Sequence, residues 1–297
     1  MGIYVIGDIH GCYTQFMELK STIEEKDSDA QFILVGDIID RGAEDEAVLA
    51  WAYENVTADG KYQMVLGNHD DKFIEVFGRG EFETLYSLRK ELRYSGSISK
   101  SDFAHLQDKD LMYQYAEFLS KQPLYKKLEV AGQKYIIVHA WYTKKIQTDV
   151  RSADEEEELE TFYGDKKEIK IAHDKRFDLI WERDREYDGV YTKGEYEPLE
   201  GEILIHGHSP TLATKDRMHR GYSPGKVWKR KNSVNVDCGL VFHVTIPEHD
   251  VYRYGNLAAY NIETGEAIYL WDIEDEYVTN DEDYYEDQKV RWGEYSY

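Results

Sequence analysis

The stretch that most constrains this chain is Leu34–Gly42, in which an apolar run ends abruptly in charged residues. The run Phe32–Val35 has the length and composition of a strand buried on both faces of a sheet. Asp37, Asp40 and Arg41 follow at its carboxyl end, where open α/β sheets place their ligands. Crowded carboxylates and a guanidinium need pairing, which a metal ion and a phosphate group would supply. Taken alone, the stretch is equally compatible with a loop that holds a local Asp–Arg pair.

The same pattern recurs at four other places, which makes a chance match a poor explanation. Apolar runs end in polar residues at Asp8 and His10, at Asn68 and His69, at His139, and at His208. Two helical segments, one from about Thr14 as N-cap and one over Glu44–Glu54, separate the first three runs. This alternation predicts parallel strands joined by right-handed crossovers, with the polar residues at one edge of the sheet.

The rest of the chain continues as a mixture of helices and strands. Helical periodicity is found over Glu81–Leu92 and Phe103–Leu119, and hairpins are expected over 124–139 and 257–271. The fold class is therefore α/β, with one domain over residues 1–271. Residues 272–297 form an acidic, tyrosine-rich tail with little apolar periodicity, which we expect to be loosely packed.

Composition excludes several classes of protein. The 297 residues carry 36 Lys plus Arg against 59 Asp plus Glu, a net charge of −23. Non-specific nucleic-acid binding depends on neutralising phosphates, so stable binding of nucleic acid is not expected. The two cysteines, Cys12 and Cys238, have no zinc-type spacing, and no stretch is long enough to span a membrane. We therefore expect a cytoplasmic protein with reduced thiols and no membrane partner.

The residues at the strand ends predict a metal site. Oxygen and imidazole ligands together suit Mn, Fe, Zn or Co better than Ca or a thiolate site. The candidates are too numerous for one ion and sufficient for two. A carboxylate shared between two ions would hold them about 3.5–4 Å apart, as in two-metal phosphoesterases. Asp37, central in the series, is the expected bridge.

These motifs resemble the PPP-type, calcineurin-like metallophosphoesterases, and within them the branch of the bacteriophage lambda protein phosphatase and its bacterial relatives. The three signature motifs of the family correspond to Gly7–Gly11, Gly36–Gly42 and Gly67–Asp70. Further counterparts occur in the same order at Ile180–Arg183, Gly207–Pro210 and Val236–Phe242. The resemblance covers about residues 3–271 and implies an α/β/β/α sandwich of two mixed sheets flanked by helices.

Carried over residue by residue, the resemblance also implies roles for the site. The first metal would be bound by Asp8, His10 and Asp37, and the second by Asp37, Asn68, His139 and His208. Asp40 would orient the catalytic His69, while Arg41, Arg183 and Asn68 would hold the phosphate. Two divalent ions are implied, with Mn the first choice and Fe, Zn, Co or Ni the alternatives. Water activated to hydroxide at such a pair attacks phosphorus directly, so Cys12 is not expected to act as a nucleophile.

The expected activity is hydrolysis of phosphate monoesters by a protein serine/threonine phosphatase of broad specificity. Leu66 and Asp70 differ from the Arg and Glu that flank Gly-Asn-His in many protein phosphatases, and they resemble the symmetrical diadenosine tetraphosphatases. A dinucleoside tetraphosphatase or other nucleotide phosphohydrolase is therefore the alternative. The form Asp40-Arg41-Gly42 favours the first expectation. A catalytically silent metal-binding scaffold is a third possibility, against which the complete ligand set argues.

Two features of the sequence leave open how a phosphoprotein or nucleotide substrate would bind. Trp141, where a small residue is expected, would either reshape the mouth of the site or simply pack. The basic segment 215–231 follows His208 and would either bind an extended anionic substrate or be a solvated insertion. The sequence makes no prediction of the oligomeric state.

Overall fold

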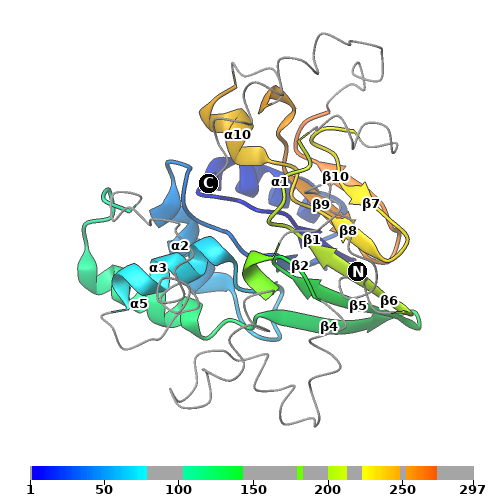
Figure 1. The fold of residues 1–297 in the computed structure, drawn as a ribbon, viewed down its shortest axis with the longest axis horizontal. Coiled ribbons are helices and arrows are strands. Elements are labelled where there is room, and N and C mark those ends of the chain that lie inside the picture. Colours follow the sequence, from blue (N-terminus) through cyan, green and yellow to red (C-terminus); the bar gives the residue numbers. More distant parts are fainter. Residues whose placement is uncertain are drawn as a thin grey trace.

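The computed structural model describes residues 2–78, 103–142, 179–182, 200–212, 223–247 and 252–272. In these ranges the strands form two five-stranded sheets, and helices lie outside them (Figure 1). The predicted sandwich of two mixed sheets flanked by helices is confirmed. The tail predicted from residue 272 lies, apart from Asp272 itself, outside the described residues, so the domain division stays a prediction.

The first sheet has the strand order β10-β9-β1-β2-β3. Its strands are β1 (Ile3–Ile6), β2 (Gln31–Leu34), β3 (Tyr62–Met64), β9 (Ala258–Asn261) and β10 (Ala267–Tyr269). β1, β2 and β3 are parallel, whereas β9 runs antiparallel to both β1 and β10. The parallel strands are those expected from the alternation of strands and helices.

The second sheet has the order β4-β5-β6-β8-β7. Its strands are β4 (Tyr125–Val130), β5 (Gln133–Val138), β6 (Glu202–His206), β7 (Trp228–Lys229) and β8 (Ser233–Asn235). β4 and β5 form the predicted hairpin around Ala131 and Gly132, which both have positive φ. β5, β6 and β8 are parallel, so their carboxyl ends also lie at one edge.

The strands are nearly continuous in apolar residues because both faces of each sheet are covered. Val5, Ile33 and Val35 belong to one buried cluster with Ile137 and Ile205 of the second sheet. The intervening side chains of β1 and β2 belong to a second buried cluster that includes residues of the helices. These helices are α1 (Tyr13–Lys26), α2 (Asp45–Asn55), α3 (Asn68–Phe77), α5 (Lys109–Ser120) and α10 (Leu240–Thr245), with a short 3₁₀ helix η1 at Tyr252–Tyr254. Figure 1 shows α2, α3 and α5 grouped on one side of the strands.

Two helix starts differ from the sequence-based expectation. Thr14 is not the N-cap of α1; it lies inside the helix, and both its N–H and its hydroxyl donate to the carboxylate of Glu44. The helix expected from Phe103 begins instead at Lys109, because the Asp108 side chain accepts two N–H groups of the first turn. The predicted helix at 81–92 lies outside the described residues.

The loops that follow β2 and β3 are in direct contact, which decides the shape of the site. A Cβ atom on Gly36, whose φ is +92°, would lie 2.4 Å from the backbone nitrogen of Gly67. A Cβ on Gly67 would lie 2.2 Å from the backbone nitrogen of Asp37. Only glycine permits so close an approach at these two positions.

Candidate metal centre

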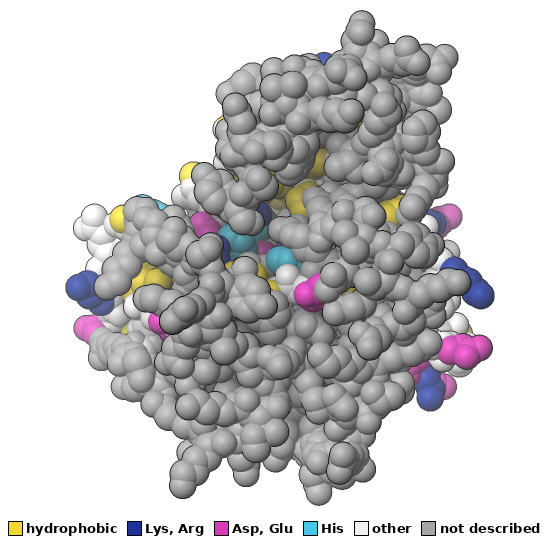
Figure 2. All heavy atoms as spheres, in the orientation of Figure 1, with side chains coloured by type: hydrophobic (Ala, Val, Ile, Leu, Met, Phe, Trp, Pro, Cys, Tyr) yellow, Lys and Arg dark blue, Asp and Glu magenta, His cyan; other side chains and the backbone are white. Residues whose placement is uncertain are grey.

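The carboxyl ends of the parallel strands in both sheets bring the predicted ligands together. Asp8, His10, Asp37, Asp40, Asn68, His69, His139 and His208 are all at most 9% exposed. Histidine, acidic and basic side chains are visible in the middle of the face shown in Figure 2. So many polar side chains are kept buried only where they bind one another or a ligand.

Backbone strain is concentrated at the same residues. Of the six non-glycine residues with positive φ in the described ranges, five are His10, Asp37, Asp40, Arg41 and His208. A positive φ at such residues costs energy and persists only where the surrounding structure enforces it. The fold therefore holds these side chains in orientations that ordinary strand-to-loop connections would not produce.

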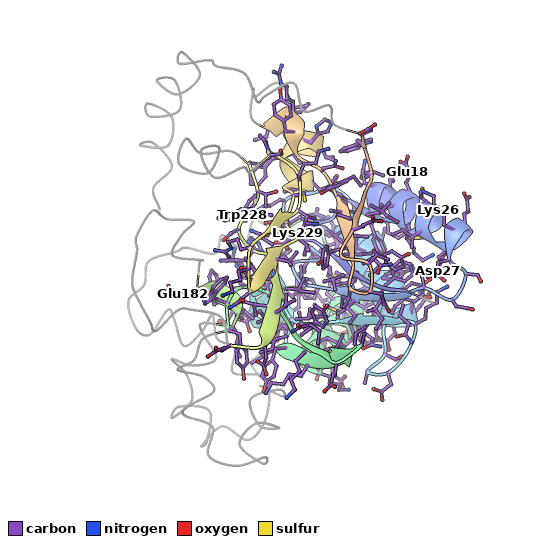
Figure 3. All side chains as sticks on the ribbon, turned by 90° about the vertical axis from the view of Figure 1, so that its right-hand side faces the viewer. Glu18, Lys26, Asp27, Glu182, Trp228 and Lys229 are labelled. Carbon is purple, nitrogen blue, oxygen red and sulfur yellow. The ribbon has the colours of Figure 1, made fainter. Side chains whose placement is uncertain are left out.

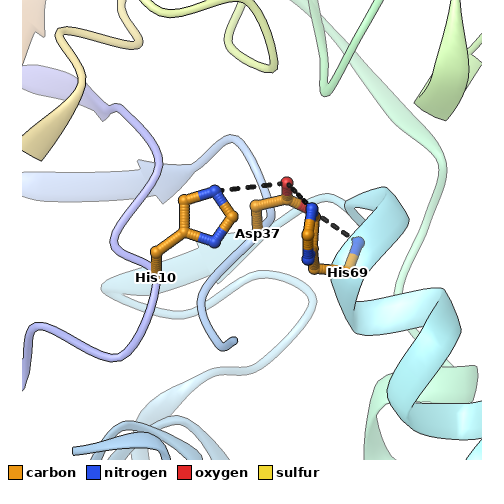
Figure 4. A group of neighbouring side chains, drawn as sticks. All are labelled: His10, Asp37 and His69. Carbon is orange, nitrogen blue, oxygen red and sulfur yellow. Dashed lines mark hydrogen bonds and ion pairs between the residues drawn. The ribbon is translucent and has the colours of Figure 1, made fainter. Parts of the chain in front are cut away.

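Asp37 is the centre of the group. Its Oδ2 lies 3.6 Å from Nε2 of His10, 3.8 Å from Nε2 of His69 and 3.3 Å from Nε2 of His139. Figure 4 shows the carboxylate between the His10 and His69 rings. Its Oδ1 accepts the backbone N–H of His69 at 2.8 Å, which fixes the carboxylate.

The tautomers of two histidines follow from their backbone partners. Nδ1 of His10 lies 3.0 Å from the Ile39 carbonyl, and Nδ1 of His139 lies 2.8 Å from the Val35 carbonyl. Since a carbonyl only accepts, both Nδ1 atoms carry the proton and both Nε2 atoms are free to act as ligands. Such outer contacts commonly orient metal-binding imidazoles.

The lone pairs around His139 indicate where a cation fits. Its Nε2 lies 3.0 Å from Oδ1 of Asn68 and 3.3 Å from Oδ2 of Asp37. Three acceptor atoms this close repel one another unless a proton or a cation lies between them. The His208 ring is also near, with its centroid 5.0 Å from that of His139. The donor set therefore fits a metal ion.

Asp8 lies beside this group and is held by the loop after β6. Its carboxylate accepts the backbone N–H of His208 at 3.2 and 3.3 Å, and its Oδ2 is 4.0 Å from Nε2 of His10. Burial, reinforced by the charges of Asp237 and Asp37, raises the pKa of Asp8 well above its usual range. Burial also raises the pKa of Asp237, to about 6. Cations would offset the repulsion among these buried carboxylates.

Two groups of ligand atoms are compact enough to hold an ion, and they share Asp37. One consists of His10, Asp37 and His69, and the other of Asp37, His139 and His208. The sequence placed Asp8 rather than His69 with His10 and Asp37. The geometry thus agrees with a shared Asp37 and with His139 and His208, and it brings His69 closer to the first group than was expected.

His69, Asp40 and Arg41 form a hydrogen-bonded chain at the edge of the group. Nδ1 of His69 lies 2.5 Å from Oδ2 of Asp40, while Nη2 of Arg41 lies 3.0 Å from Nε2 of His69. Burial alone would raise the pKa of Asp40, but its hydrogen bond to His69 prevails and lowers that pKa to about 2. Burial lowers the pKa of His69 to about 4; the Asp37 carboxylate opposes this shift and Arg41 adds to it. His69 is therefore neutral, donates from Nδ1 and accepts at Nε2.

Arg41 reaches across the first group of ligands. Its Nη1 donates to Nε2 of His10 at 2.6 Å, and its guanidinium lies 5.9 Å from the centre of the Phe242 ring. A metal ion bound to Nε2 of His10 would replace the contact with Arg41 and release the guanidinium for another partner. Arg183, the second predicted phosphate ligand, lies outside the described residues.

Other features singled out in the sequence are not part of the ligand group. Cys12 and Cys238 are free and buried, and burial raises the pKa of Cys12 to about 12, which agrees with its expected lack of nucleophilic function. Trp141 is 2% exposed and packs edge-on against His206, with ring centroids 5.0 Å apart. Trp141 thus packs rather than projecting into solvent.

In the part of the chain that the structure describes, no helix has the length and apolar character needed to cross a membrane.

The basic residues in the described part of segment 215–231 differ in where they lie. Residues 215–222 are outside the described ranges. Lys229, on the edge strand β7 (Figure 3), donates to the carbonyl of Gly265 at 2.9 Å. Gly265 lies in the turn after β9, next to the start of β1, whereas Asp8 follows the end of β1. The guanidinium of Arg230 lies over the rings of Trp228 and Trp141. Lys229 therefore does not support a role of this segment in binding an extended anionic substrate, whereas Arg230 lies near the ends of β5 and β6, beside Trp141.

Three buried aspartates near the site, Asp45, Asp70 and Asp237, were assigned no contact with it from the sequence. Asp237 follows β8, so the rule that found the other strand-end ligands could have found it. Asp45 and Asp70 bind backbone N–H groups of the loop after β2. Since these contacts depend on how the loops meet in three dimensions, no signal in the sequence reveals them.

Comparison with known proteins agrees with this geometry. The profile of the calcineurin-like phosphoesterase family matches residues 1–262. The asymmetrical bis(5'-nucleosyl)-tetraphosphatase PrpE of Oceanobacillus iheyensis is 24% identical over 250 residues, covering 82% of this chain and 85% of that protein. The symmetrical bis(5'-nucleosyl)-tetraphosphatase of Janthinobacterium sp. is 32% identical over 141 residues, covering 47% of this chain and 43% of that protein. The chain thus spans less than half the length of this symmetrical relative.

Two solved structures share the fold. A serine/threonine phosphatase from Saccharomyces cerevisiae, described as similar to human PP5, gives a TM-score of 0.52 at 11% identity, covering 92% of this chain and 81% of that one. A cold-active protein-tyrosine phosphatase from Shewanella sp. gives a TM-score of 0.51 at 15% identity, covering 91% and 80%. At such identities these likenesses concern the fold alone. Together with the family profile, they support one conclusion: this chain belongs to the calcineurin-like metallophosphoesterase family.

Proposed function

We propose that this metallophosphoesterase hydrolyses dinucleoside polyphosphates, with diadenosine tetraphosphate as a representative substrate. The observation that carries the proposal is the convergence of three imidazoles on Asp37, with His69, Asp40 and Arg41 beside them. Such a site suits phosphoryl chemistry. The choice of substrate class is supported by PrpE, a relative that this chain matches over most of both lengths and that is named a bis(5'-nucleosyl)-tetraphosphatase.

The residues that would hold the cations are those the sequence assigned. Asp8, His10 and Asp37 would bind one ion, and Asp37, Asn68, His139 and His208 would bind the other. Two bound divalent cations, with Mn our first choice, would neutralise phosphate charge and lower the pKa of the attacking water. The contribution of the chain is to hold these ligands rigidly through the backbone contacts of His10, His139 and His208.

Arg41 would bind the phosphate oxygens. Its guanidinium is held between His10 and His69, at the edge of the ligand group. A planar guanidinium matches two phosphate oxygens at once and stabilises the charge that develops on them. We expect Arg183 and Asn68 to assist, as the sequence predicts.

His69 and Asp40 would supply the proton to the leaving oxygen. Asp40 accepts the Nδ1–H of His69, so Nε2 faces the site. The negative charge of a bound polyphosphate favours protonation of that imidazole, and the Asp40 carboxylate stabilises the imidazolium. Its Nε2–H can then be donated to the phosphate that departs.

The first expectation from the sequence, a protein serine/threonine phosphatase of broad specificity, has less support than this alternative. The yeast serine/threonine phosphatase is 11% identical and informs on the fold alone. A catalytically silent scaffold is disfavoured by the arrangement of His69, Asp40 and Arg41. The cytoplasmic location, the identity of the metal and the binding of a phosphoprotein or a nucleotide stay predictions.

Two substrates offered to one Mn-loaded sample test the proposal. We expect kcat/KM for diadenosine tetraphosphate to exceed that for a phosphoserine peptide by about tenfold or more, since each 1.4 kcal/mol of preferential transition-state binding gives a factor of ten. Chromatography of the products, as AMP plus ATP or as two ADP, would identify the bond that is cleaved. Asp37→Asn is the control that assigns turnover to this site. A kcat/KM that favours the peptide would overturn the proposal.

A further inference from the structure

Asp45 is a buried carboxylate at the beginning of α2 that contacts the loop bearing Asp40 and Arg41. It is 1% exposed, and its Oδ1 accepts the backbone N–H of Asp40 at 2.9 Å. Glu46, also in the first turn of α2, is exposed. Asp45 therefore has a partner in the site that its neighbour in the helix lacks.

The loop that Asp45 contacts has a strained backbone. Asp40 and Arg41 are consecutive non-glycine residues with φ of 74° and 79°. Oδ1 of Asp40 accepts the N–H of Arg41 at 2.8 Å, and the N–H of Asp40 is held by Asp45. Two adjacent left-handed residues persist only if surrounding contacts fix them. Their conformation directs Asp40 to His69 and lets Arg41 reach His10 and His69.

Asp45 also fills the space between the loops after β1 and β2. A Cβ atom on Gly11 would lie 2.3 Å from Oδ1 of Asp45, so the carboxylate packs directly against that backbone. The N–H of Gly42 donates to the carbonyl of His10 at 3.0 Å, which joins the two loops again nearby. The carboxylate thus has little freedom to move away from Asp40.

The second oxygen of Asp45 has no hydrogen bond in the described part of the chain but lies within ion-pair distance of a histidine from another segment. Nε2 of His105 lies 3.2 Å from Oδ2, and the His105 side chain is 46% exposed while that of Asp45 is 0% exposed. His105 belongs to the turn between Phe103 and Leu106 that precedes α5. Burial raises the pKa of Asp45 to about 6, so contacts such as that with His105 help to keep the carboxylate charged.

We propose that Asp45 is a positioning residue for Asp40 and Arg41, and that His105 holds Asp45 in place. The inference rests on the roles proposed above for Asp40, His69 and Arg41. Without the Asp45 contact, Asp40 would relax from its left-handed conformation and its carboxylate would leave Nδ1 of His69. Proton donation to the leaving oxygen would then be impaired, while the ligands around Asp37 would remain.

Two aryl phosphates that differ in leaving group test this role in the Mn-loaded protein. Phenolate departs poorly and needs a proton, whereas p-nitrophenolate departs well without one. We expect Asp45→Ala to lower kcat for phenyl phosphate about 10–100-fold, a partial loss of the roughly 10²–10⁴-fold that general acid catalysis supplies, and kcat for p-nitrophenyl phosphate only about threefold. Asp45→Asn, which keeps the Oδ1 acceptor, should restore activity to within about threefold of the wild type on both substrates.

His105→Ala provides a variant at a partly exposed position, where loss of the fold is not expected. It should reproduce the pattern of Asp45→Ala more weakly, with about a three- to tenfold loss on phenyl phosphate. Glu46→Ala is the matched control, because it removes a carboxylate from the same turn of α2 without touching the loop. It should leave both rates unchanged.

Metal content and thermal midpoints, measured on every variant, separate positioning from general damage. Unchanged metal content together with a loss confined to phenyl phosphate supports the inference. Equal losses on both substrates, loss of metal, or an unaffected Asp45→Ala and His105→Ala would overturn it. Because aryl phosphates report the chemistry of the site rather than its natural substrate, an error in the proposed substrate would leave this comparison intact.

Discussion

Asp70 joins the two loops that carry Asp37 and Asn68, and its replacement by Asn is the sharpest test of how the site is held. Its Oδ2 accepts the N–H groups of Asp37 and Gly67, each at 2.9 Å, and its Oδ1 accepts the N–H of Ile38 at 3.1 Å. The residue is 0% exposed, so water cannot replace any of these bonds. Asp70→Asn would change the hydrogen bonding while preserving the size of the side chain.

The expected cost follows from counting donors. An Asn side chain has one oxygen, so if that oxygen keeps the bonds to Asp37 and Gly67, its amide nitrogen faces the N–H of Ile38. One buried N–H is then left unpaired, at a cost of about 1–3 kcal/mol. The two remaining bonds also lose the strength that a charged acceptor gives.

Relief of charge repulsion reduces this cost. Burial and the nearby charge of Asp37 raise the pKa of Asp70 to about 7, so the carboxylate is itself destabilised by its surroundings. Removing that charge recovers part of the loss. We expect Asp70→Asn to lower the free energy of unfolding by about 2–3 kcal/mol.

Urea denaturation of the metal-free protein at pH 8 measures this difference. In the metal-free protein, the effect of the Asp70 hydrogen bonds is measured apart from any effect on metal binding. At pH 8 Asp70 is ionised in the folded state. Asp59→Asn, at an exposed turn, is the control and should stay within about 0.5 kcal/mol of the wild type. A loss below about 0.5 kcal/mol in Asp70→Asn would refute the argument that the carboxylate holds the loops together.

Three further predictions concern the ligand group and the surface. His69→Ala should retain the metal content of the wild type in elemental analysis yet lose most of its kcat on diadenosine tetraphosphate, about 10²-fold or more, because the proposed proton donor is removed; full activity would refute its role. Asp37→Asn should lose metal affinity in calorimetric titration as well as activity, because three imidazoles converge on that carboxylate, and unchanged affinity would contradict this. Burial would raise the pKa of Glu24, but its hydrogen bonds with Lys20, Lys61 and a tyrosine lower it to about 2 from 4.5. The contribution of Glu24 to stability, about 1 kcal/mol after allowance for solvent, is therefore complete above pH 4.5 and is lost as the pH falls towards 2. The stability difference between wild type and Glu24→Gln should shrink between pH 7 and pH 3 in urea denaturation, and a constant difference would count against the ion pairs.

The two residues that suggested a substrate class from the sequence have a different role in the structure. Leu66 and Asp70 are both 0% exposed, so neither can touch a substrate. Leu66 and Asp70 instead contribute to the packing and the hydrogen bonds of the loop after β3. Residues on the surface of the site are therefore the candidates for distinguishing a phosphopeptide from a dinucleotide, and Phe242, partly exposed beside Arg41, is one candidate for mutation.

Local sequence patterns predicted the secondary structure correctly where it depends on interactions between residues close together in the chain. An apolar run of about four residues followed at once, or after a single glycine, by a polar residue marks a buried strand and its carboxyl end, and this rule located Asp8, Asp37 and His139. The hairpin at Ala131 and Gly132 was predicted for the same reason, because turn residues specify their own backbone conformation. Helix starts were predicted less well. Thr14 has the side chain of an N-cap, but its partner Glu44 comes from 30 residues away.

The sequence by itself determined the fold class, the family and which strand ends meet at one edge, because parallel strands bring their carboxyl ends together whatever the details of packing. The tertiary structure alone decided which atoms face one another. It placed His69 nearer than Asp8 to the first group of ligands, turned Asp45 and Asp70 toward backbone N–H groups of the loop after β2, and held Lys229 at the end of the sheets away from Asp8. These outcomes depend on distances of a few ångströms between segments far apart in the chain, and no local pattern of residues encodes such distances.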